Sequence, residues 1–210
     1  MGVTRVVEAA HSLMVGLFSM VSWSSPLHVV MVGLDSSGKS TALFRLKYGQ
    51  YVNAVPTVGF NCEKVRVGGS VWAVWDVGGA ERVRGLWTAY TRATDALVFV
   101  VDSSSSWERL EEARLELHRL TKQQHAQCAA LNAPRPPILL LANKQDLPSA
   151  REPEMLVKAL GLNDLLPDHQ QQIWAVAPAC AVTGEGLQEA MQQLHALITT
   201  SRKLYKSRKQ

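Results

Sequence analysis

A glycine-rich stretch, Gly33-Leu-Asp-Ser-Ser-Gly-Lys-Ser40, follows directly on an apolar run and precedes a segment with a helical pattern. A turn of this kind between a strand and a helix is typical of phosphate-binding loops in α/β proteins. Gly33 and Gly38 let the backbone bend so that successive amide N–H groups face one anion. Lys39 can place a positive charge near the β- and γ-phosphates of a nucleotide, and the Ser40 hydroxyl can bind Mg²⁺. A plain turn with a solvated Lys39 is the alternative, which the strand-to-helix context disfavours.

A second motif, Asn143-Lys-Gln-Asp146, indicates which base the nucleotide carries. It follows the apolar run Ile138–Ala142, so it lies at the carboxyl end of a strand, where open α/β sheets bind ligands. The carboxylate of Asp146 can accept hydrogen bonds from N1–H and N2–H₂ of guanine, which adenine cannot offer. Asn143 can bond the acceptor edge of the base or tie this loop to the phosphate loop, and the aliphatic part of Lys144 can lie on the base plane. A strand-end turn with a helix-capping aspartate is the alternative.

Length and composition are those of one domain with a short appendage, since the chain has 210 residues of which 47% are apolar. The three cysteines, Cys62, Cys128 and Cys180, are widely spaced and lack the spacing of a metal site. We therefore expect a reducing cytosol and no disulfide framework. No apolar run approaches the ~18–20 residues of a membrane span.

Strand-like and helix-like patterns alternate along the chain and predict an α/β fold: a doubly wound, mostly parallel, six-stranded sheet with one antiparallel hairpin. The expected strands are Leu27–Val32, Phe60–Val67, Val71–Trp75, Ala96–Val101, Ile138–Ala142 and Ile173–Ala177. The expected helices begin at Lys39, Trp107, Glu152 and Gly186. Glycines in Gly68-Gly69-Ser70 can supply the positive φ values of the hairpin turn.

The helix from Trp107 carries two further signals. A capping-box pattern from Ser105 to Glu108 is expected to start it. An apolar stripe at helical spacing is expected to face the core, and it comprises Trp107, Leu110, Ala113, Leu117 and Leu120.

Two segments between the nucleotide motifs have the composition of switch loops. Thr57, in Pro56-Thr-Val-Gly-Phe60, offers a hydroxyl that could reach Mg²⁺ or a γ-phosphate. Asp76, in Trp75-Asp-Val-Gly-Gly79, offers a carboxylate for the water shell of the metal, and the glycines after it allow the backbone to approach the γ-phosphate. Such contacts would exist only with a triphosphate bound, so they can order a loop on binding. Taken singly, each is more often a solvated polar residue.

The chain resembles the Arf-like branch of the Ras superfamily of small GTPases. The motifs that carry the resemblance span residues 27 to about 200 and are Gly33–Ser40, Pro56–Asn61, Trp75–Gly79, Leu86-Trp87 with Tyr90, Asn143–Asp146 and Cys180-Ala181. Within this branch, the segment Trp107–Thr121 and the basic tail are most similar to the type-four ADP-ribosylation-factor-like subfamily. The hairpin is shorter than that subfamily usually has. The resemblance implies the phosphate-loop small-GTPase fold, with residues 1–25 as an amphipathic helix, 26–200 as the GTP-binding domain and 201–210 as a basic tail.

The resemblance also implies a set of ligand contacts for GTP or GDP and Mg²⁺. The implied nucleotide-binding residues are Gly33, Asp35, Ser36, Ser37, Gly38, Lys39, Ser40, Thr41, Thr57, Asp76, Gly79, Asn143, Lys144, Asp146, Cys180 and Ala181. Ser40 and Thr57 are the implied Mg²⁺ ligands, and the Cys180-Ala181 pair would give a backbone N–H to the base. The implied hydrolysis site comprises Lys39, Thr57, Gly79 and position 80.

Position 80 is the most important departure from the family. Ala80 stands where these proteins normally carry the glutamine that orients the attacking water. A methyl group cannot hydrogen-bond water, so we expect slow hydrolysis; loss of one such contact typically costs ~10²–10³ in rate. An arginine from a GTPase-activating protein could stabilise charge but could not place the water. Glu81, one residue out of register, is the alternative water-orienting group, and Asp35 in the phosphate loop is compatible with poor intrinsic hydrolysis.

These observations predict a GTP-binding switch in signal transduction and vesicle trafficking. Phe60, Trp75 and Tyr90 match the aromatic triad through which this family receives effectors, and burial in the core is the alternative for each. Exchange and GTPase-activating factors are further expected partners, and the protein is expected to be a monomer. A GTP-locked scaffold with negligible turnover is one alternative function. A phosphate-loop ATPase or small-molecule kinase is another, which Asn143–Asp146 disfavours.

The N-terminal segment has an amphipathic helical pattern. Its apolar stripe comprises Val3, Val6, Val7, Ala10, Leu13, Met14, Leu17 and Val21. A secretory signal is the rival interpretation, but Glu8, His11 and Ser12 interrupt its apolar core. Gly2 is a candidate for myristoylation, although Val6 stands where the acceptor pattern has Ser or Thr.

The other terminus concentrates positive charge. Its five basic residues are Arg202, Lys203, Lys206, Arg208 and Lys209, whereas the net charge of the whole chain is +4. The excess is therefore local, which disfavours a nucleic-acid-binding face. The tail fits an anionic membrane surface, an import signal for the nucleus, or a solvated helix end. We expect a cytoplasmic protein that associates peripherally with membranes.

Overall fold

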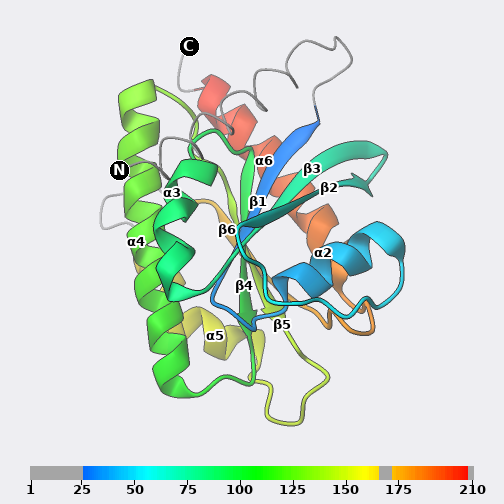
Figure 1. Ribbon diagram of the computed structural model, residues 1–210. Coiled ribbons are helices and arrows are strands. Elements are labelled where there is room, and N and C mark those ends of the chain that lie inside the picture. The colour runs from blue at the N-terminus through cyan, green and yellow to red at the C-terminus, as the bar shows by residue number, and fades with distance from the viewer. Residues whose placement is uncertain (1–25, 166–171, 208–210) are drawn as a thin grey trace.

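The computed structural model describes residues 26–165 and 172–207. A six-stranded sheet lies at its centre, with strand order β2-β3-β1-β4-β5-β6 (Figure 1). The strands are β1 (Leu27–Val32), β2 (Phe60–Val67), β3 (Ser70–Val77), β4 (Ala96–Asp102), β5 (Ile138–Asn143) and β6 (Trp174–Pro178). β2 and β3 pair antiparallel, and the other neighbours pair parallel. The predicted fold class, with its single antiparallel hairpin, is confirmed.

Helices cover both faces of the sheet, with α2 and α6 on one face and α3, α4 and α5 on the other (Figure 1). Their bounds are α2 (Lys39–Tyr48), α3 (Trp87–Tyr90), α4 (Trp107–Leu131), α5 (Pro153–Ala159) and α6 (Leu187–Ser207). Two short 3-10 turns, η1 (Glu81–Leu86) and η2 (Leu162–Asp164), lie between them. No helix within residues 26–165 and 172–207 is both long and apolar enough to cross a membrane.

Two apolar layers form the core, one on each face of the sheet. Along β1, Val29 and Met31 join the layer under α2 and α6, while Val30 and Val32 join the layer under α4 and α5. A strand that is buried on both faces must be apolar at every position, which explains the continuous apolar runs of β1, β4 and β5. Because these strands run parallel, their carboxyl ends meet at one edge of the sheet, where the polar motifs follow.

Several predicted boundaries are wrong by one or two residues. β3 begins at Ser70 and continues to Val77, because its pairing with β2 extends from Val67↔Ser70 to Phe60↔Val77. β4 and β5 each end one residue later than predicted, and β6 begins at Trp174.

Helix starts also differ from the sequence prediction. The N-cap of α4 is Ser106, whose Oγ accepts from Arg109 N at 3.3 Å, so the capping box placed at Ser105 is wrong by one residue. α5 begins at Pro153, after Glu152 as N-cap, because proline fits the first helical position. α6 begins at Leu187, after Gly186 at φ +73°.

The predicted core stripe of α4 is confirmed at four positions and wrong at the fifth. Leu110, Ala113, Leu117 and Leu120 are buried. Trp107, at the first helical position, is 55% exposed, and the guanidinium of Arg151 lies 4.4 Å from the centre of its ring. The indole therefore forms a cation–π contact at the surface instead of filling the core.

Candidate functional site

The phosphate loop, residues 33–40, has a backbone that only glycine can adopt at two positions. Gly33 has φ +143°, and a Cβ there would lie 2.2 Å from Val100 O. Gly38 has φ +91°, and a Cβ there would lie 2.2 Å from Asn143 Nδ2. The two glycines therefore allow both the turn and the close packing of this loop against β4 and the loop after β5.

Lys39 crosses the phosphate loop from the first residue of α2. Its Nζ donates to Gly33 O at 2.9 Å and to Leu34 O at 2.8 Å, and the residue is 5% exposed. Burial lowers the pKa of the ammonium to about 8, against the opposing influence of nearby Asp76. The side chain therefore remains mainly protonated at neutral pH, with a charge that is only partly compensated, which favours an anion in the loop.

Ser40, Thr57 and Asp76, each predicted from the sequence to contact Mg²⁺ or its water shell, lie together in the structure. Ser40 Oγ lies 2.5 Å from Asp76 Oδ2 and 2.8 Å from Thr57 Oγ1. Asn61, which the sequence analysis left without a role, donates from Nδ2 to Asp76 Oδ2 at 3.0 Å. Asp76 is fully buried, and its Oδ1 has no hydrogen-bond partner in the described part of the chain. Two hydroxyls beside an unpaired, buried carboxylate oxygen form a set of hard oxygen donors that fits Mg²⁺.

A cavity of about 430 Å³ opens over these groups. Its lining residues are Asp35, Ser36, Gly38, Lys39, Ser40, Thr41, Ala54, Val55, Pro56, Thr57, Gly79, Ala80 and Lys144. Most of the predicted phosphate contacts thus share one cavity with the segment before β2 and with the start of the segment after β3. Its volume is in the range of small-molecule sites.

The loop after β5 is tied to the phosphate loop by Asn143. The Nδ2 of Asn143 donates to Ser37 O at 2.8 Å, and its Oδ1 accepts from Ala181 N at 2.9 Å. Of the two roles that the sequence left open for Asn143, the structure has the one that connects loops. Cys180 is buried, and its N donates to Glu185 O at 2.9 Å. Both backbone amides of the Cys180-Ala181 pair are therefore engaged within the protein, and their contact with a base stays a prediction.

Lys144 and Asp146 occupy different environments in that loop. Lys144 has φ +66°, and its Nζ lies 2.8 Å from Asp102 Oδ2. Partial burial alone would raise the pKa of Asp102, but hydrogen bonds from Lys144 and Ser104 outweigh it and lower the pKa. Asp146 is exposed, which leaves its carboxylate accessible to a ligand. Asp102 was not predicted, although its position at the end of β4, on the same edge of the sheet, is the signal that could have identified it.

The segment after β3 packs directly on the phosphate loop. A Cβ on Gly79 would lie 2.3 Å from Gly33 O, and the indole Nε1 of Trp87 donates to Gly78 O at 2.9 Å. Ala80 lines the cavity, whereas Glu81 is exposed at the start of η1. Neither η1 nor the buried Arg84 within it was predicted from the sequence. Its alternation of charged and apolar residues has no clear helical or strand period, so no sequence signal marked it.

The three aromatic residues proposed as an effector contact do lie together. The ring centre of Phe60 is 5.0 Å from that of Trp75 and 5.4 Å from that of Tyr90. Phe60 is 39% exposed, while Trp75 and Tyr90 are buried. Of the three rings, only that of Phe60 is substantially exposed, so the alternative of core packing fits Trp75 and Tyr90.

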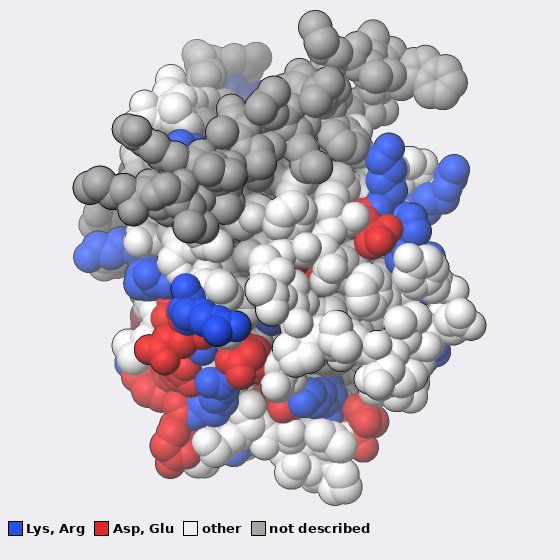
Figure 2. Space-filling view, in the orientation of Figure 1, with Lys and Arg blue, Asp and Glu red and all other residues white. Residues whose placement is uncertain are grey.

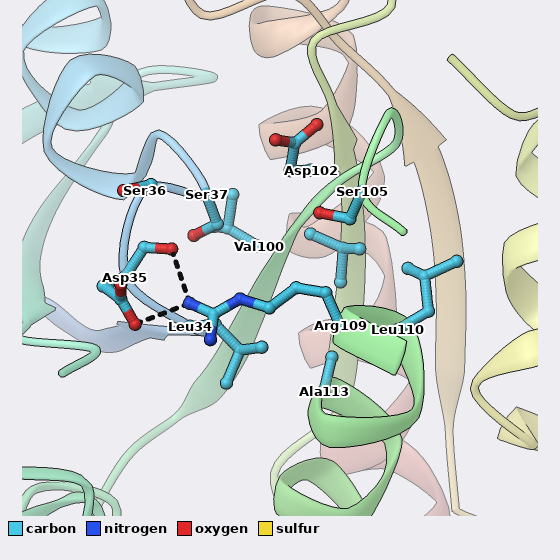
Figure 3. A pocket seen from close by; sticks show the side chains of 11 residues that line it. Leu34, Asp35, Ser36, Ser37, Val100, Asp102, Ser105, Arg109, Leu110 and Ala113 are labelled. Atoms are coloured by element: carbon cyan, nitrogen blue, oxygen red, sulfur yellow. Dashed lines mark hydrogen bonds and ion pairs between the residues drawn. The ribbon is translucent and has the colours of Figure 1, made fainter. Parts of the chain in front are cut away.

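A smaller cavity of about 230 Å³ lies on the other side of the phosphate loop, toward α4 (Figure 3). Arg109 reaches from the first turns of α4 to Asp35, and its Nη2 donates to Asp35 Oδ1 at 2.6 Å and to Asp35 O at 3.2 Å. Partial burial would raise the pKa of Asp35, but the hydrogen bond and charge of Arg109 outweigh it and lower the pKa. Asp35 is thus held as an ionised carboxylate by α4.

Comparison with known proteins gives consistent matches over nearly the whole chain. The model of the ADP-ribosylation factor family matches residues 13–198. ADP-ribosylation factor-like protein 4C from Homo sapiens is 44% identical over 196 residues, which cover 91% of this chain and 96% of that protein. ADP-ribosylation factor-like protein 4D from Mus musculus is 47% identical over 188 residues, which cover 87% of this chain and 88% of that protein.

Two solved structures are similar in fold. The Arl6 BBS3 small GTPase from Trypanosoma brucei, with the bound nucleotide analogue GppNp, has a TM-score of 0.73 and 34% sequence identity, and the match covers 84% of this chain and 99% of that chain. The mammalian SRP receptor has a TM-score of 0.68 at 21% identity, which shows a shared fold alone.

Proposed function

Because the chain belongs to the ADP-ribosylation factor family, with type-four ADP-ribosylation-factor-like proteins among its relatives, we propose that it is a GTP-binding molecular switch. The observation that carries the proposal is the bond between the two nucleotide motifs. Asn143, from the loop predicted to bind guanine, donates to Ser37 O of the phosphate loop at 2.8 Å. This bond brings the two motifs together, so that one ligand could span both, with its phosphates over Lys39 and its base near Asp146.

The cluster of Ser40, Thr57 and Asp76 would hold Mg²⁺ at the phosphate end. The metal, when bound, neutralises charge on the β- and γ-phosphates. Ser40 and Thr57 would supply hydroxyl oxygens, and Asp76 would orient water around the ion. Asn61 supports this arrangement, since its hydrogen bond at 3.0 Å holds the Asp76 carboxylate in place.

We further propose that hydrolysis is slow because Ala80 offers no side-chain hydrogen bond to a water in the cavity. The exposed position of Glu81 supports this inference, since a solvated carboxylate is not preorganised for that role. A GTP-locked scaffold with negligible turnover is the second candidate, and Ala80 is the feature that favours it.

Membrane association is a separate proposal that rests on both ends of the chain. The proposed N-terminal amphipathic helix, residues 1–25 with Gly2, lies outside the described residues. At the other end, α6 continues through Ser207, so residues 201–207 form its last turns. Arg202 pairs with Asp95 at 2.6 Å, while Lys203 and Lys206 are exposed. Exposed lysines near a helix end fit an anionic lipid surface, and an import signal fits them as well.

Effectors, exchange factors and a GTPase-activating protein are the proposed partners, with Phe60 as the exposed member of the aromatic contact. The first experiment is to denature the purified full chain and identify the released nucleotide by chromatography. Guanine nucleotide supports the switch, and adenine nucleotide would overturn it. Mostly GTP would favour the locked scaffold, whereas mostly GDP would show that hydrolysis proceeds without a glutamine at position 80.

A further inference from the structure

Arg84, in η1, joins three parts of the protein through one buried guanidinium. The residue is 4% exposed. Its Nε donates to Gly79 O at 2.7 Å, and its Nη1 donates to Glu112 Oε1 at 2.7 Å. Its Nη2 lies 3.5 Å from Asp35 Oδ1. The segment after β3, the phosphate loop and α4 therefore meet at a single side chain.

Two more arginines complete this charge cluster, which consists of Asp35, Arg84, Arg109, Glu112, Glu116 and Arg119. Arg109 donates to Asp35, as Figure 3 shows, and also donates to Glu112 Oε2 at 2.6 Å. Glu116 lies 3.7 Å from Arg84 and 2.7 Å from Arg119. Three carboxylates thus balance three guanidinium groups, and Figure 2 shows acidic and basic side chains intermixed over the first half of α4.

The carboxylates of Asp35 and Glu112 stay ionised at neutral pH, because the pKa of each is lowered. Partial burial alone would raise the pKa of Glu112, but hydrogen bonds from Arg84 and Arg109 outweigh it and lower the pKa. Arginine does not lose its proton in proteins. A buried arginine with an ionised partner on each side is fixed in direction, since moving it would leave a buried charge unpaired.

The contact with Gly79 O orients the peptide between Gly79 and Ala80. The described chain contains no cis peptide bond, so the carbonyl of Gly79 and the N–H of Ala80 point to opposite sides. Arg84 holds the carbonyl side. The Ala80 N–H is therefore turned away from Arg84, in a residue that lines the phosphate cavity. Because residue 80 has only a methyl side chain, its backbone is the polar group that it can offer to a ligand.

We propose that Arg84 is a positioning residue that holds the Gly79-Ala80 peptide in place for the γ-phosphate of a bound triphosphate, with Glu112 as its support. The inference rests on the proposed guanine nucleotide binding and deepens it. It also gives the segment after β3 a role in triphosphate binding, and this role does not depend on a glutamine at position 80. A diphosphate lacks the γ-phosphate, so Arg84 would contribute to triphosphate affinity and hardly at all to diphosphate affinity.

The test compares two variants and a matched control in the full-length protein. Glu112→Gln removes the supporting charge but keeps an oxygen at the same place. Arg84→Lys keeps the charge but lacks the Nε donor and the planar fork. Glu111→Gln is the control, because Glu111 is the neighbour of Glu112 on α4 and pairs at 2.7 Å with Arg114, outside the cluster.

The measurement is the dissociation constant for a non-hydrolysable GTP analogue and for GDP, both with Mg²⁺, by displacement of a fluorescent nucleotide. We expect both test variants to lose about tenfold in affinity for the triphosphate, the effect typical of a hydrogen bond to a charged group. Affinity for GDP should change by less than about twofold, and Glu111→Gln should match the wild type in both.

Three outcomes would overturn the proposal. Equal losses for GDP and the triphosphate, with a lower unfolding temperature, would mean that Arg84 only supports the fold. Unchanged triphosphate affinity in Glu112→Gln and Arg84→Lys would mean that the peptide needs no such support. A wild type that binds neither nucleotide would refute the proposed function itself, and this result differs from the other two because it precedes any variant.

Discussion

The phosphate loop and the segment that follows β3 lie against each other, yet they are held in place by different means. Residues 33–40 owe their shape to the main chain, since Gly33 and Gly38 sit where any side chain would collide with neighbouring atoms. Residues 79–86 share this constraint only at Gly79, and otherwise owe their arrangement largely to side chains, above all to the buried Arg84 and its carboxylate partners on α4. One wall of the cavity is thus fixed by steric necessity, and the opposite wall by a set of charges.

This difference implies different responses to change. A main-chain turn without room for a Cβ tolerates almost no substitution and keeps one shape. A wall held by ion pairs can be altered by single substitutions or by a ligand that competes for the same donors. A switch needs both properties, because the bound phosphates must be fixed while the reporting segment must be able to move.

The largest effect is expected when a methyl group is added to the phosphate loop, the wall that steric contacts hold in place. Gly33→Ala would place Cβ 2.2 Å from Val100 O at φ +143°, whereas Gly69→Ala, at φ +81°, would meet nothing within 4 Å. We expect Gly69→Ala to cost about 1 kcal/mol in unfolding free energy and Gly33→Ala to cost about 3 kcal/mol more. Urea unfolding of both variants measures the difference. Equal losses would show that the phosphate loop can relax and is not sterically fixed.

The second largest effect is expected at Ala80, in the cavity wall formed by the segment after β3. Ala80→Gln should raise the single-turnover rate of GTP hydrolysis by about 10²–10³, because the amide can orient a water in the cavity. Glu81→Gln is the control and should leave the rate unchanged, since Glu81 is exposed. A rate that falls in Glu81→Gln and stays constant in Ala80→Gln would assign the water to Glu81 instead.

How much of the fold the sequence predicts likewise depends on whether an element is determined by its local pattern or by contacts distant in sequence. β1, β4 and β5 were predicted to within one residue because each is an apolar run that both core layers bury, as Val29 and Val30 of β1 show. Trp107 was assigned to the core because helical spacing alone does not reveal that the first residue of α4 lies at the protein surface. Its 55% exposure depends on tertiary position, and so does its contact with Arg151.

The residues of the site also divide into those with a local sequence signal and those whose role depends on tertiary contacts. The residues of the phosphate loop were predicted because glycine and lysine at fixed spacing have few other uses. Arg84 was missed because its role depends on Glu112, which is distant in sequence and reaches it only in the folded chain. Asn61 was missed for a similar reason, since β2 must pair with β3 before its amide can reach Asp76. Local motifs are predictable, whereas partners that carry no sequence signal of their own, such as Glu112, are not.

A pH titration separates the two kinds of positive charge. Burial lowers the pKa of Lys39 to about 8 in the free protein, whereas arginine side chains do not lose their proton in proteins. Bound phosphates favour the protonated lysine, so above pH 8 binding must take up a proton. The dissociation constant for GDP should therefore rise between pH 8 and 9 by up to about tenfold and stay nearly constant from pH 7 to 7.5. Lys39→Met should bind more weakly but without this rise, and an equal rise in both proteins would exclude Lys39 as its source.

The smallest effect is expected at the margin of the charge cluster. Glu116 lies 3.7 Å from Arg84 Nη1, farther than the 2.7 Å of Glu112, and it keeps Arg119 as a second partner. Glu116→Gln should therefore lower the unfolding free energy by no more than about 0.5 kcal/mol, as removal of a weak ion pair does. The ratio of triphosphate to diphosphate affinity should not change.

This small effect decides how the charged wall works. If Glu116→Gln shifts the affinity ratio as much as Glu112→Gln does, the net charge around Arg84 is what matters, and the direction of its hydrogen bonds is not. The segment after β3 would then be held by a diffuse field that any salt could weaken. If only Glu112→Gln shifts the ratio, the guanidinium acts through its 2.7 Å contacts with Gly79 O and Glu112, and this wall is as directional as the glycine turn it faces.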